Sequence, residues 1–177
     1  MKTRILFALA ACMLSSPAST EDSPAGDAAF LFAYYPKPGQ EDAFSAGYRE
    51  HLDWHRRNHD PLPWYGWTVG SGDRIGMFVD GSFGISFAAF DNRVKPRQDG
   101  ADFARTAAPH SDVAYRKVMR LMPHLGTATR LEDRSPSAAI EVMSVAVRPG
   151  KTALFESCLQ RLVATLKQAD RNPEFTV

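Results

Sequence analysis

The chain has 177 residues, of which 44% are hydrophobic, and its 21 Lys and Arg residues nearly balance 20 Asp and Glu residues. A chain of this length can bury a substantial core, and a balanced charge provides no electrostatic footprint for nucleic acid or for an anionic membrane surface. We therefore expect a globular protein with no nucleic-acid partner.

The N-terminus has the pattern of a secretory signal. MKTR supplies two basic residues, ILFALAACML is an unbroken apolar run, and Ser16-Pro17-Ala18 places small residues where signal peptidase cleaves. The apolar run covers about half of the roughly 20 residues that a membrane-spanning helix needs, so no transmembrane segment is predicted. The pattern predicts a signal peptide at 1–18 and a periplasmic or secreted protein.

A lipoprotein is the alternative, because Leu9-Ala10-Ala11-Cys12 resembles a bacterial lipobox that would anchor the protein through Cys12. If Cys12 leaves with the signal, Cys158 is the only cysteine of the mature chain, and no intramolecular disulfide can form. The small, polar and acidic residues 19–28 predict a flexible leader before the fold.

Apolar runs, helical periodicity and turn residues predict the remaining elements in chain order. Pro38-Gly39 opens the first helix, Ser71-Gly72-Asp73 is a hairpin turn, and Pro109 interrupts or restarts the second helix. GISFAAFD (84–91) either prolongs the preceding strand or bulges away from it. The predicted elements are a strand at 29–35, a helix at 41–59, a hairpin of 64–70 and 74–81, a helix at 101–122 and a strand at Thr127–Leu131. Their β-α-β-β-α-β order predicts an α+β, ferredoxin-like unit over 29–132.

An internal repeat relates the segment that begins at residue 30 to the C-terminal residues 141–177. At a constant offset of 111 residues, Pro38-Gly39 aligns with Pro149-Gly150, Phe44 with Phe155, and Trp64 with Phe175. Each copy reads as a strand, a turn and an amphipathic helix. The chain is therefore predicted to carry a partial second repeat, a strand and a helix, at 138–177.

These motifs resemble the dimeric α/β-barrel superfamily, which includes antibiotic-biosynthesis-type monooxygenases, NIPSNAP-like proteins and haem-binding or haem-degrading members. The residues that carry the resemblance are Lys37-Pro38-Gly39 at the end of the first strand, Glu41 and Phe44 at the start of the helix, and the strand from Trp64 to Trp67 with its hairpin. The resemblance implies that the ferredoxin-like unit closes a barrel by pairing its sheet, as a homodimer or with a completed second repeat.

Three of the five histidines lie in HLDWHRRNHD at a spacing of four residues: His51, His55 and His59. On a helical wheel they share the face of Phe44, together with Tyr48 and Leu52. The repeat places Leu162 at the His51 position and Leu166 at the His55 position. We therefore expect His51 and His55 to be buried, and if they were core residues only, leucine would replace both without loss of stability.

Buried imidazoles need hydrogen-bond partners or a ligand, and the sequence leaves three interpretations open. The favoured function is a small-molecule-binding or monooxygenase-like pocket between the sheet and the first helix, in which His51 or His55 acts as the catalytic general base or as a hydrogen-bond donor. The predicted ligand-binding residues are Tyr48, His59, Trp64 and Trp67. The partner is then a small-molecule ligand.

The second interpretation is a non-catalytic haem or metal carrier that uses His51 or His55, and the third is a structural or interaction module with histidines in its core. A haem or a divalent metal is thus a possible cofactor. His51 and His59 are about 12 Å apart along a helix that rises about 1.5 Å per residue, so the three histidines cannot bind one ion. Further ligands would have to come from Asp60, Asp80 or His110.

Overall fold

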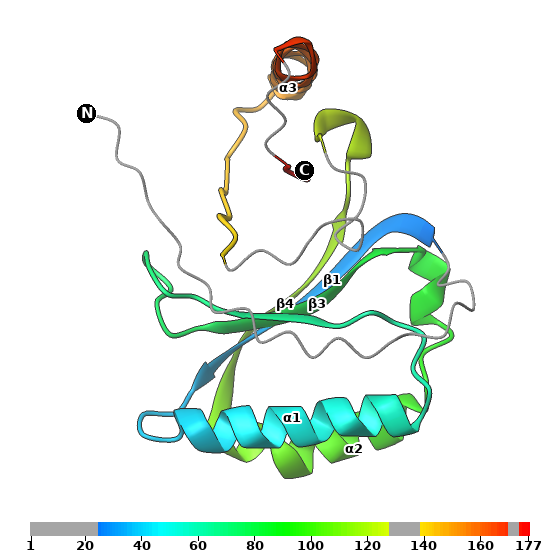
Figure 1. Cartoon of the computed structure of the whole chain (residues 1–177), viewed down its shortest axis with the longest axis vertical. Coiled ribbons are helices and arrows are strands. Elements are labelled where there is room, and N and C mark those ends of the chain that lie inside the picture. The colour runs from blue at the N-terminus through cyan, green and yellow to red at the C-terminus, as the bar shows by residue number, and fades with distance from the viewer. Residues whose placement is uncertain (1–24, 128–138, 170–173) are drawn as a thin grey trace.

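The computed structural model describes residues 25–127, 139–169 and 174–177. Its central element is a four-stranded sheet of order β2-β3-β1-β4 in which all neighbouring strands are antiparallel. Helices α1 and α2 cover one face of this sheet (Figure 1). The elements of this layer pair are β1 (Ala25–Pro36), α1 (Glu41–Arg57), β2 (Tyr65–Thr68), β3 (Phe78–Ile85), α2 (Pro96–Thr106) and β4 (Ser111–Arg120). The α+β class is confirmed, and this arrangement is compatible with a ferredoxin-like unit.

Strand β1 lies in the centre of the sheet and separates its two faces. Side chains alternate along a strand, so Phe32 and Tyr34 point to the helices while Leu31 and Ala33 point to the opposite face. Tyr34 packs with Phe44 and other residues of the helical layer, whereas Ala33 belongs to a separate cluster with Val69 and Met77. The sheet therefore has apolar side chains on both faces, as the sequence of β1 requires.

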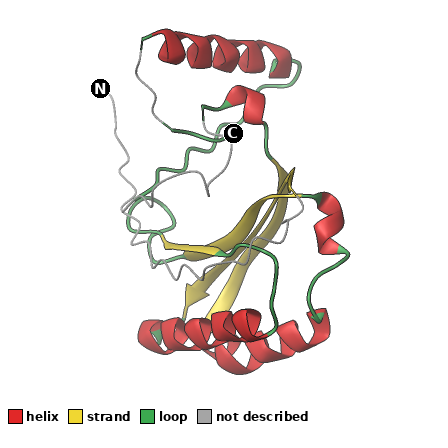
Figure 2. Cartoon of the chain, turned by 45° about the vertical axis from the view of Figure 1, so that its right-hand side comes forward, coloured by secondary structure: helices red, strands yellow, loops and turns green. Residues whose placement is uncertain are grey.

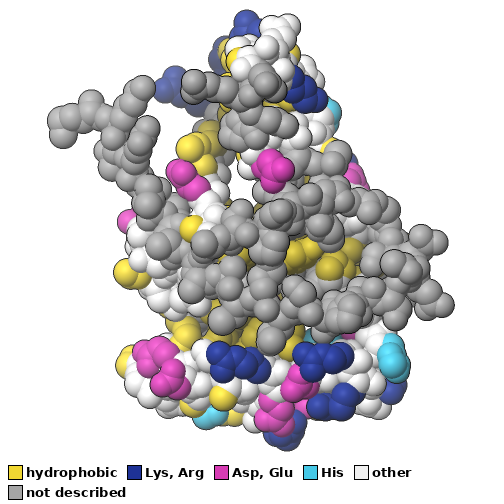
Figure 3. All heavy atoms as spheres, in the orientation of Figure 1, with side chains coloured by type: hydrophobic (Ala, Val, Ile, Leu, Met, Phe, Trp, Pro, Cys, Tyr) yellow, Lys and Arg dark blue, Asp and Glu magenta, His cyan; other side chains and the backbone are white. Residues whose placement is uncertain are grey.

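Helix α1 begins after the Pro38-Gly39 turn, where Gly39 has a φ of 75° that favours glycine. Acidic residues in its first turn and basic residues in its last turn complement the helix dipole. Arg49, Glu50, Arg56 and Arg57 are exposed, on the side of the helix opposite to Phe44. Figure 3 shows acidic and basic side chains interspersed over the outer surface of this layer.

The helix that the repeat predicts in its second copy is confirmed. Helix α3 (Thr152–Gln168) occupies the positions that the 111-residue offset assigns to α1, and Gly150 before it has a φ of 73°, close to that of Gly39. Figure 2 shows α3 at the far end of the molecule from α1 and α2. Among the described residues, 139–148 pair with no strand, so the strand of the second copy is not formed in this sheet.

The predicted helix at 101–122 is wrong. Helix α2 ends at Thr106, a short 3-10 turn containing Pro109 follows, and Ser111–Arg120 forms β4 against β1. Proline lacks the N–H that a continuing helix would need, and the following sequence DVAYRKVM suits an extended strand with alternating faces. The strand forms because one edge of β1 is open for pairing, and the periodicity of a sequence does not show whether such an edge exists.

The hairpin is confirmed, because β2 and β3 pair from Tyr65 and Gly81 to Thr68 and Phe78. Strand β3 continues through Gly84, and a 3-10 turn at Phe87–Phe90 follows it. Strand β1 begins at Ala25, inside the predicted leader. The predicted signal peptide lies outside the described residues, as does the predicted strand beyond Thr127, which itself is in a bend. No helix in the described part of the chain is long and apolar enough to cross a membrane.

Helices α1 and α2 approach each other closely at one residue. A Cβ atom added to Gly47 would lie 2.1 Å from the carbonyl oxygen of Thr106, so only glycine allows this contact. Phe103 of α2 and Tyr48 of α1 pack into the same cluster with Tyr34 of the sheet. The close approach places the inner side chains of α2 directly opposite those of α1.

Candidate metal centre

Two histidines and one aspartate converge where α1 faces α2. His51 and His55 lie one turn apart on α1, Asp99 lies in the first turn of α2, and all three are buried, with 6–7% of their surface exposed. The two Nε2 atoms are 3.2 Å apart, and Oδ1 of Asp99 lies 3.3 Å from Nε2 of His51 and 3.4 Å from Nε2 of His55. Three potential ligand atoms therefore form a nearly equilateral triangle.

The size of this triangle matches a metal-ligand set. Bonds of about 2.0–2.1 Å at tetrahedral angles place ligand atoms about 3.3 Å apart, whereas the right angles of an octahedral site with the same bonds give about 2.9 Å. The observed separations of 3.2–3.4 Å favour the tetrahedral arrangement. No fourth histidine, cysteine or carboxylate among the described residues joins the cluster, so one tetrahedral position remains for a small ligand.

A carboxylate binds the outer nitrogen of each histidine. Nδ1 of His51 is 3.0 Å from Oδ2 of Asp102, and Nδ1 of His55 is 2.6 Å from Oδ2 of Asp60. An ionised carboxylate only accepts hydrogen bonds, so we assign the proton of each neutral imidazole to Nδ1 and the lone pair to Nε2. Such carboxylate-histidine pairs are the usual support of metal-binding histidines. The Nε2 lone pairs of both histidines then face the carboxylate of Asp99. These three groups are all acceptors, so a cation or a proton has to lie between them.

Asp60 is held in place from three sides. Its Oδ2 accepts hydrogen bonds from His55 and from Nε1 of Trp64, and its Oδ1 accepts one from the backbone N–H of Leu62. Burial alone would raise the pKa of Asp60, but these three hydrogen bonds outweigh it and lower the pKa. Asp60 is therefore ionised and orients the ring of His55.

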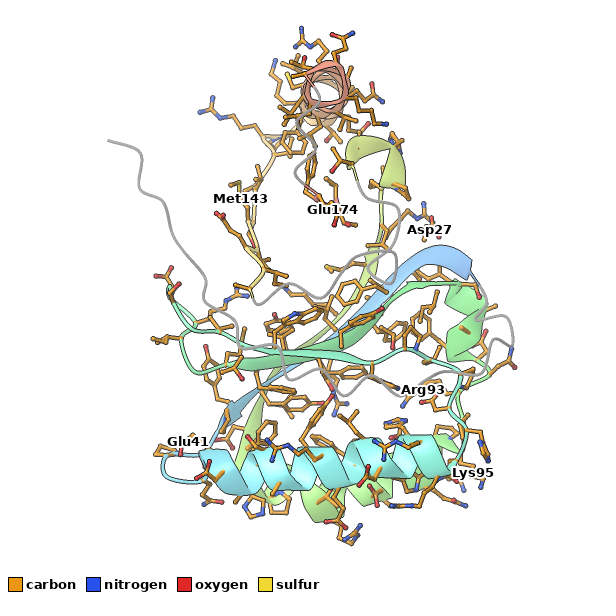
Figure 4. The ribbon with its side chains drawn as sticks, viewed as in Figure 1. Asp27, Glu41, Arg93, Lys95, Met143 and Glu174 are labelled. Atoms are coloured by element: carbon orange, nitrogen blue, oxygen red, sulfur yellow. The ribbon has the colours of Figure 1, made fainter. Side chains whose placement is uncertain are left out.

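Arginines hold the two carboxylates of α2 from the outside. Arg93 donates to Oδ2 of Asp99, and Arg105 donates to Oδ1 of Asp102 at 2.9 Å. Figure 4 shows Arg93 between the sheet and the helices, at the end of the layer where Lys95 lies. Burial opposes ionisation of both aspartates, but the hydrogen bond from His51 and the arginine charges lower the pKa of each.

The contacts of His51 also determine how strongly a proton competes with a metal ion for its imidazole. Burial would lower the pKa of His51, yet its hydrogen bonds with Asp99 and Asp102 and their negative charges raise it above 6.5. In the absence of a metal, the acidic surroundings thus favour the imidazolium form of His51. A metal ion must displace that proton, so its affinity falls as the pH is lowered.

Asp80 is a fourth carboxylate between the sheet and the helices. It lies on β3, on the face of the sheet that α1 covers. It is 4% exposed, its Oδ2 accepts a hydrogen bond of 2.6 Å from the hydroxyl of Tyr48, and its Oδ1 is buried without a partner in the described part of the chain. Burial raises the pKa of Asp80 to about 7, while the hydrogen bond from Tyr48 and the charge of His51 oppose this shift. A buried carboxylate oxygen without a donor indicates a bound water or ion.

The structure brings together four of the six residues that the sequence predicts for the site. His51, His55 and Tyr48 are buried on α1, and the ring of Trp64 lies 4.9 Å from the ring of His55. Trp67 does not join them. It stacks on Tyr65 on the opposite face of the sheet, because Trp67 and the helix-facing Gly66 and Thr68 alternate along β2.

His59 and His110 also lie outside the cluster. Helix α1 ends at Arg57, so His59, at a φ of 53°, no longer follows the helical periodicity and is exposed. His110 contacts Gln40, near the N-terminus of α1, at 2.8 Å. Of the three predicted additional ligands, Asp60 supports His55, and Asp80 lies beneath the helix.

Asp99 was missed by sequence reasoning because the second helix was placed from residue 101 onward, and Asp102, inside that predicted helix, was not connected to the histidines because the packing of this helix on the first one was not predicted. The signal was present: Asp99, Asp102, Phe103 and Thr106 recur at helical spacing after Pro96, a residue typical of a first helical turn. Acidic residues on the same stripe as a partly buried phenylalanine indicate carboxylates directed toward the interior. This pattern becomes visible only with the correct helix start.

A cavity of about 170 Å³ is lined by residues that include Asp60 and Arg93, the contacts of His55 and Asp99, but by none of the three potential ligand residues. It is smaller than the roughly 300–1,000 Å³ of sites that enclose drug-sized ligands. Since Nε2 of His51 and Nε2 of His55 face each other, the geometry suits a single ion better than a haem. Comparison with protein-family models, with curated proteins and with solved structures gives no match.

We expect Asp80→Asn to stabilise the metal-free protein at neutral pH but not at acidic pH. The pKa of Asp80 is about 7 in the fold against 3.8 ordinarily, so the folded protein binds this proton more tightly than the unfolded chain. The contribution of Asp80 to the free energy of unfolding therefore falls between about pH 4 and about pH 7, by at most about 1.4 kcal/mol per pH unit. Urea unfolding of both proteins with a chelator present measures the difference. Asp53→Asn, which changes a side chain that is 45% exposed, is the control. Curves of constant separation would contradict the prediction.

Proposed function

We propose that this protein binds one divalent transition-metal ion, zinc in preference, through Nε2 of His51, Nε2 of His55 and Oδ1 of Asp99. The observation that carries the proposal is the triangle of ligand atoms with sides of 3.2, 3.3 and 3.4 Å. Imidazole and carboxylate are typical zinc ligands, and three protein ligands with one open position characterise catalytic rather than structural zinc sites. Asp60 and Asp102 supply the orienting contacts.

The same geometry favours a metal over a metal-free general base. A histidine base needs a lone pair that faces its substrate, but the Nε2 atoms of His51 and His55 face each other and Asp99. The favoured small-molecule pocket therefore becomes, in our proposal, the open position of the metal and its surroundings. Tyr48 and Trp64 remain near that position, whereas Trp67 does not.

Export to the periplasm or secretion is part of the proposal and rests on the pattern of residues 1–18. The homodimer and the closed barrel stay predictions. Their support is the apolar surface of the edge strand β4, where Val113 and Val118 are each 56% exposed. Two hydrophobic side chains on one strand are consistent with pairing, and a monooxygenase-like activity rests on the family resemblance alone.

Zinc titration of the metal-stripped protein tests the proposed centre. We expect one ion per chain, and His55→Ala should weaken the affinity at least about 100-fold, because removal even of an orienting partner costs about 10–100-fold. His59→Ala is the matched control: it removes an exposed histidine just beyond the same helix and should leave the affinity unchanged. Equal affinities of the wild type and His55→Ala would exclude this centre.

A further inference from the structure

The carboxylate of Asp80 has an orientation that the metal ligands alone do not explain. Its residue lies on the helix-facing side of β3, and the hydroxyl of Tyr48, which precedes His51 by one helical turn, donates to Oδ2. This contact leaves Oδ1 as the oxygen without a partner among the residues that the structure describes. Burial and the charge of Asp80 raise the pKa of Tyr48, so Tyr48 keeps its proton and stays the donor.

Asp80 is linked to the proposed centre through Tyr48, whose hydroxyl donates to Oδ2 of Asp80 and whose ring centroid lies 6.5 Å from that of His51. The charges of His51 and Asp99 both act on the pKa of Asp80, although neither residue is hydrogen-bonded to it. A buried polar group without a partner indicates an additional donor, and a water molecule in the open metal position would supply one. The cluster of three ligand atoms lacks Asp80, so its carboxylate is not a member of the ligand set.

We propose that Asp80 accepts the proton of a water molecule held in the open position of the metal, so that the centre activates water for hydrolysis of a small ester. The inference rests on the proposed function, since without a metal there is no bound water to activate. In this step the O–H bond of the water breaks, its electron pair stays on the oxygen, and the proton passes to Oδ1 of Asp80. The hydroxide then attacks the carbonyl carbon of the ester and forms a new C–O bond. The C–O bond to the alkoxide breaks, and the departing alkoxide takes the proton from Oδ1 of Asp80, which returns Asp80 to its ionised form.

Azide binding to the cobalt-loaded full chain tests whether Asp80 faces the open position. Cobalt reports its ligands through its visible spectrum, and azide is an anion that replaces bound water. We expect Asp80→Asn to bind cobalt within about threefold of the wild-type affinity and azide at least about tenfold more tightly, because a buried carboxylate repels a neighbouring anion. Asp80→Ser should give the same result. Asp53→Asn, which changes a half-exposed aspartate on the solvent side of α1, should bind azide like the wild type.

Three results would overturn the inference. Equal azide affinities in the wild type and Asp80→Asn would show that Asp80 does not face the open position. A loss of cobalt affinity of about 100-fold in Asp80→Asn and Asp80→Ser would make Asp80 a fourth ligand and close the site. A wild-type chain that binds no cobalt would instead refute the proposed function itself, so the two failures are distinguishable.

Hydrolysis of p-nitrophenyl acetate by the zinc-loaded protein tests the catalytic step. Loss of a general base typically lowers a rate about 10²–10⁴-fold, so we expect a decrease of kcat in this range for Asp80→Asn. The decrease should occur at saturating zinc with one ion still bound per chain, and Asp53→Asn should keep the wild-type rate. An unchanged kcat in Asp80→Asn would refute the role of Asp80 as proton acceptor.

Discussion

Replacement of both His51 and His55 by leucine should abolish zinc binding and the zinc-dependent part of the free energy of unfolding. At a free zinc concentration 1,000 times the dissociation constant, an ion that binds only the folded state stabilises it by about 4 kcal/mol. The double variant retains only Asp99 of the three ligands, so zinc should no longer raise its melting temperature. Thermal unfolding followed by circular dichroism, with zinc and with a chelator, measures the effect for each protein.

The stability of the double variant without metal tests whether the two histidines act only as core residues. Leucine at the equivalent positions, Leu162 and Leu166, suggests from the sequence that the change is tolerated. The structure predicts a loss of stability instead, because Asp60 and Asp102 each lose a hydrogen-bond donor. Oδ2 of Asp60 keeps Trp64, but Oδ2 of Asp102 is left without a donor, which costs about 1–3 kcal/mol. His59→Leu serves as the control. Zinc-dependent stabilisation of the double variant equal to that of the wild type would disprove the ligand set.

Gly47→Ala should destabilise the protein by about 2–3 kcal/mol and weaken zinc binding at the same time. The new Cβ would lie 2.1 Å from the carbonyl oxygen of Thr106, and backbone, unlike a flexible side chain, has to shift as a whole. Such a shift moves α2, which carries Asp99, away from the histidines of α1. Urea unfolding and zinc titration of the variant measure the two effects.

Gly100→Ala provides the matched control within α2. A Cβ at Gly100 would meet no atom within 4 Å, and its φ is not in the left-handed region. Alanine there removes the entropic penalty of a helical glycine and should stabilise the protein by about 0.5–1 kcal/mol, with zinc affinity unchanged. If Gly47→Ala were as well tolerated as Gly100→Ala, the close contact of the two helices would not hold.

The repeat supports this interpretation of Gly47. The offset of 111 residues places Cys158 of α3 at the Gly47 position, and Cys158 is exposed. No helix in the described part of the chain packs on α3 as α2 packs on α1, so a side chain is tolerated there. Likewise, Leu162 is 47% exposed although it aligns with the buried His51. The same helical pattern has a different environment in each copy.

The sequence by itself determined the elements whose causes are local. A turn with glycine in the left-handed region and a stripe of apolar residues at helical spacing were enough to place α1 and α3, and alternation with a Ser-Gly-Asp turn was enough for the β2-β3 hairpin. Burial of His51 and His55 was also predictable, because the amphipathic period selects one face of α1. Local patterns decided neither the end of α1 before His59 nor the strand β4.

Only the tertiary structure decided which groups surround the two histidines. Asp99 and Asp102 lie more than 40 residues away along the chain, and they reach the imidazoles because Gly47 lets α2 pack directly on α1. The alternation of β2 likewise directs Trp67 away from the helices although Trp64 faces them. Periodicity specifies the direction of a side chain relative to its own element, whereas a ligand set depends on distances between elements, which packing alone establishes.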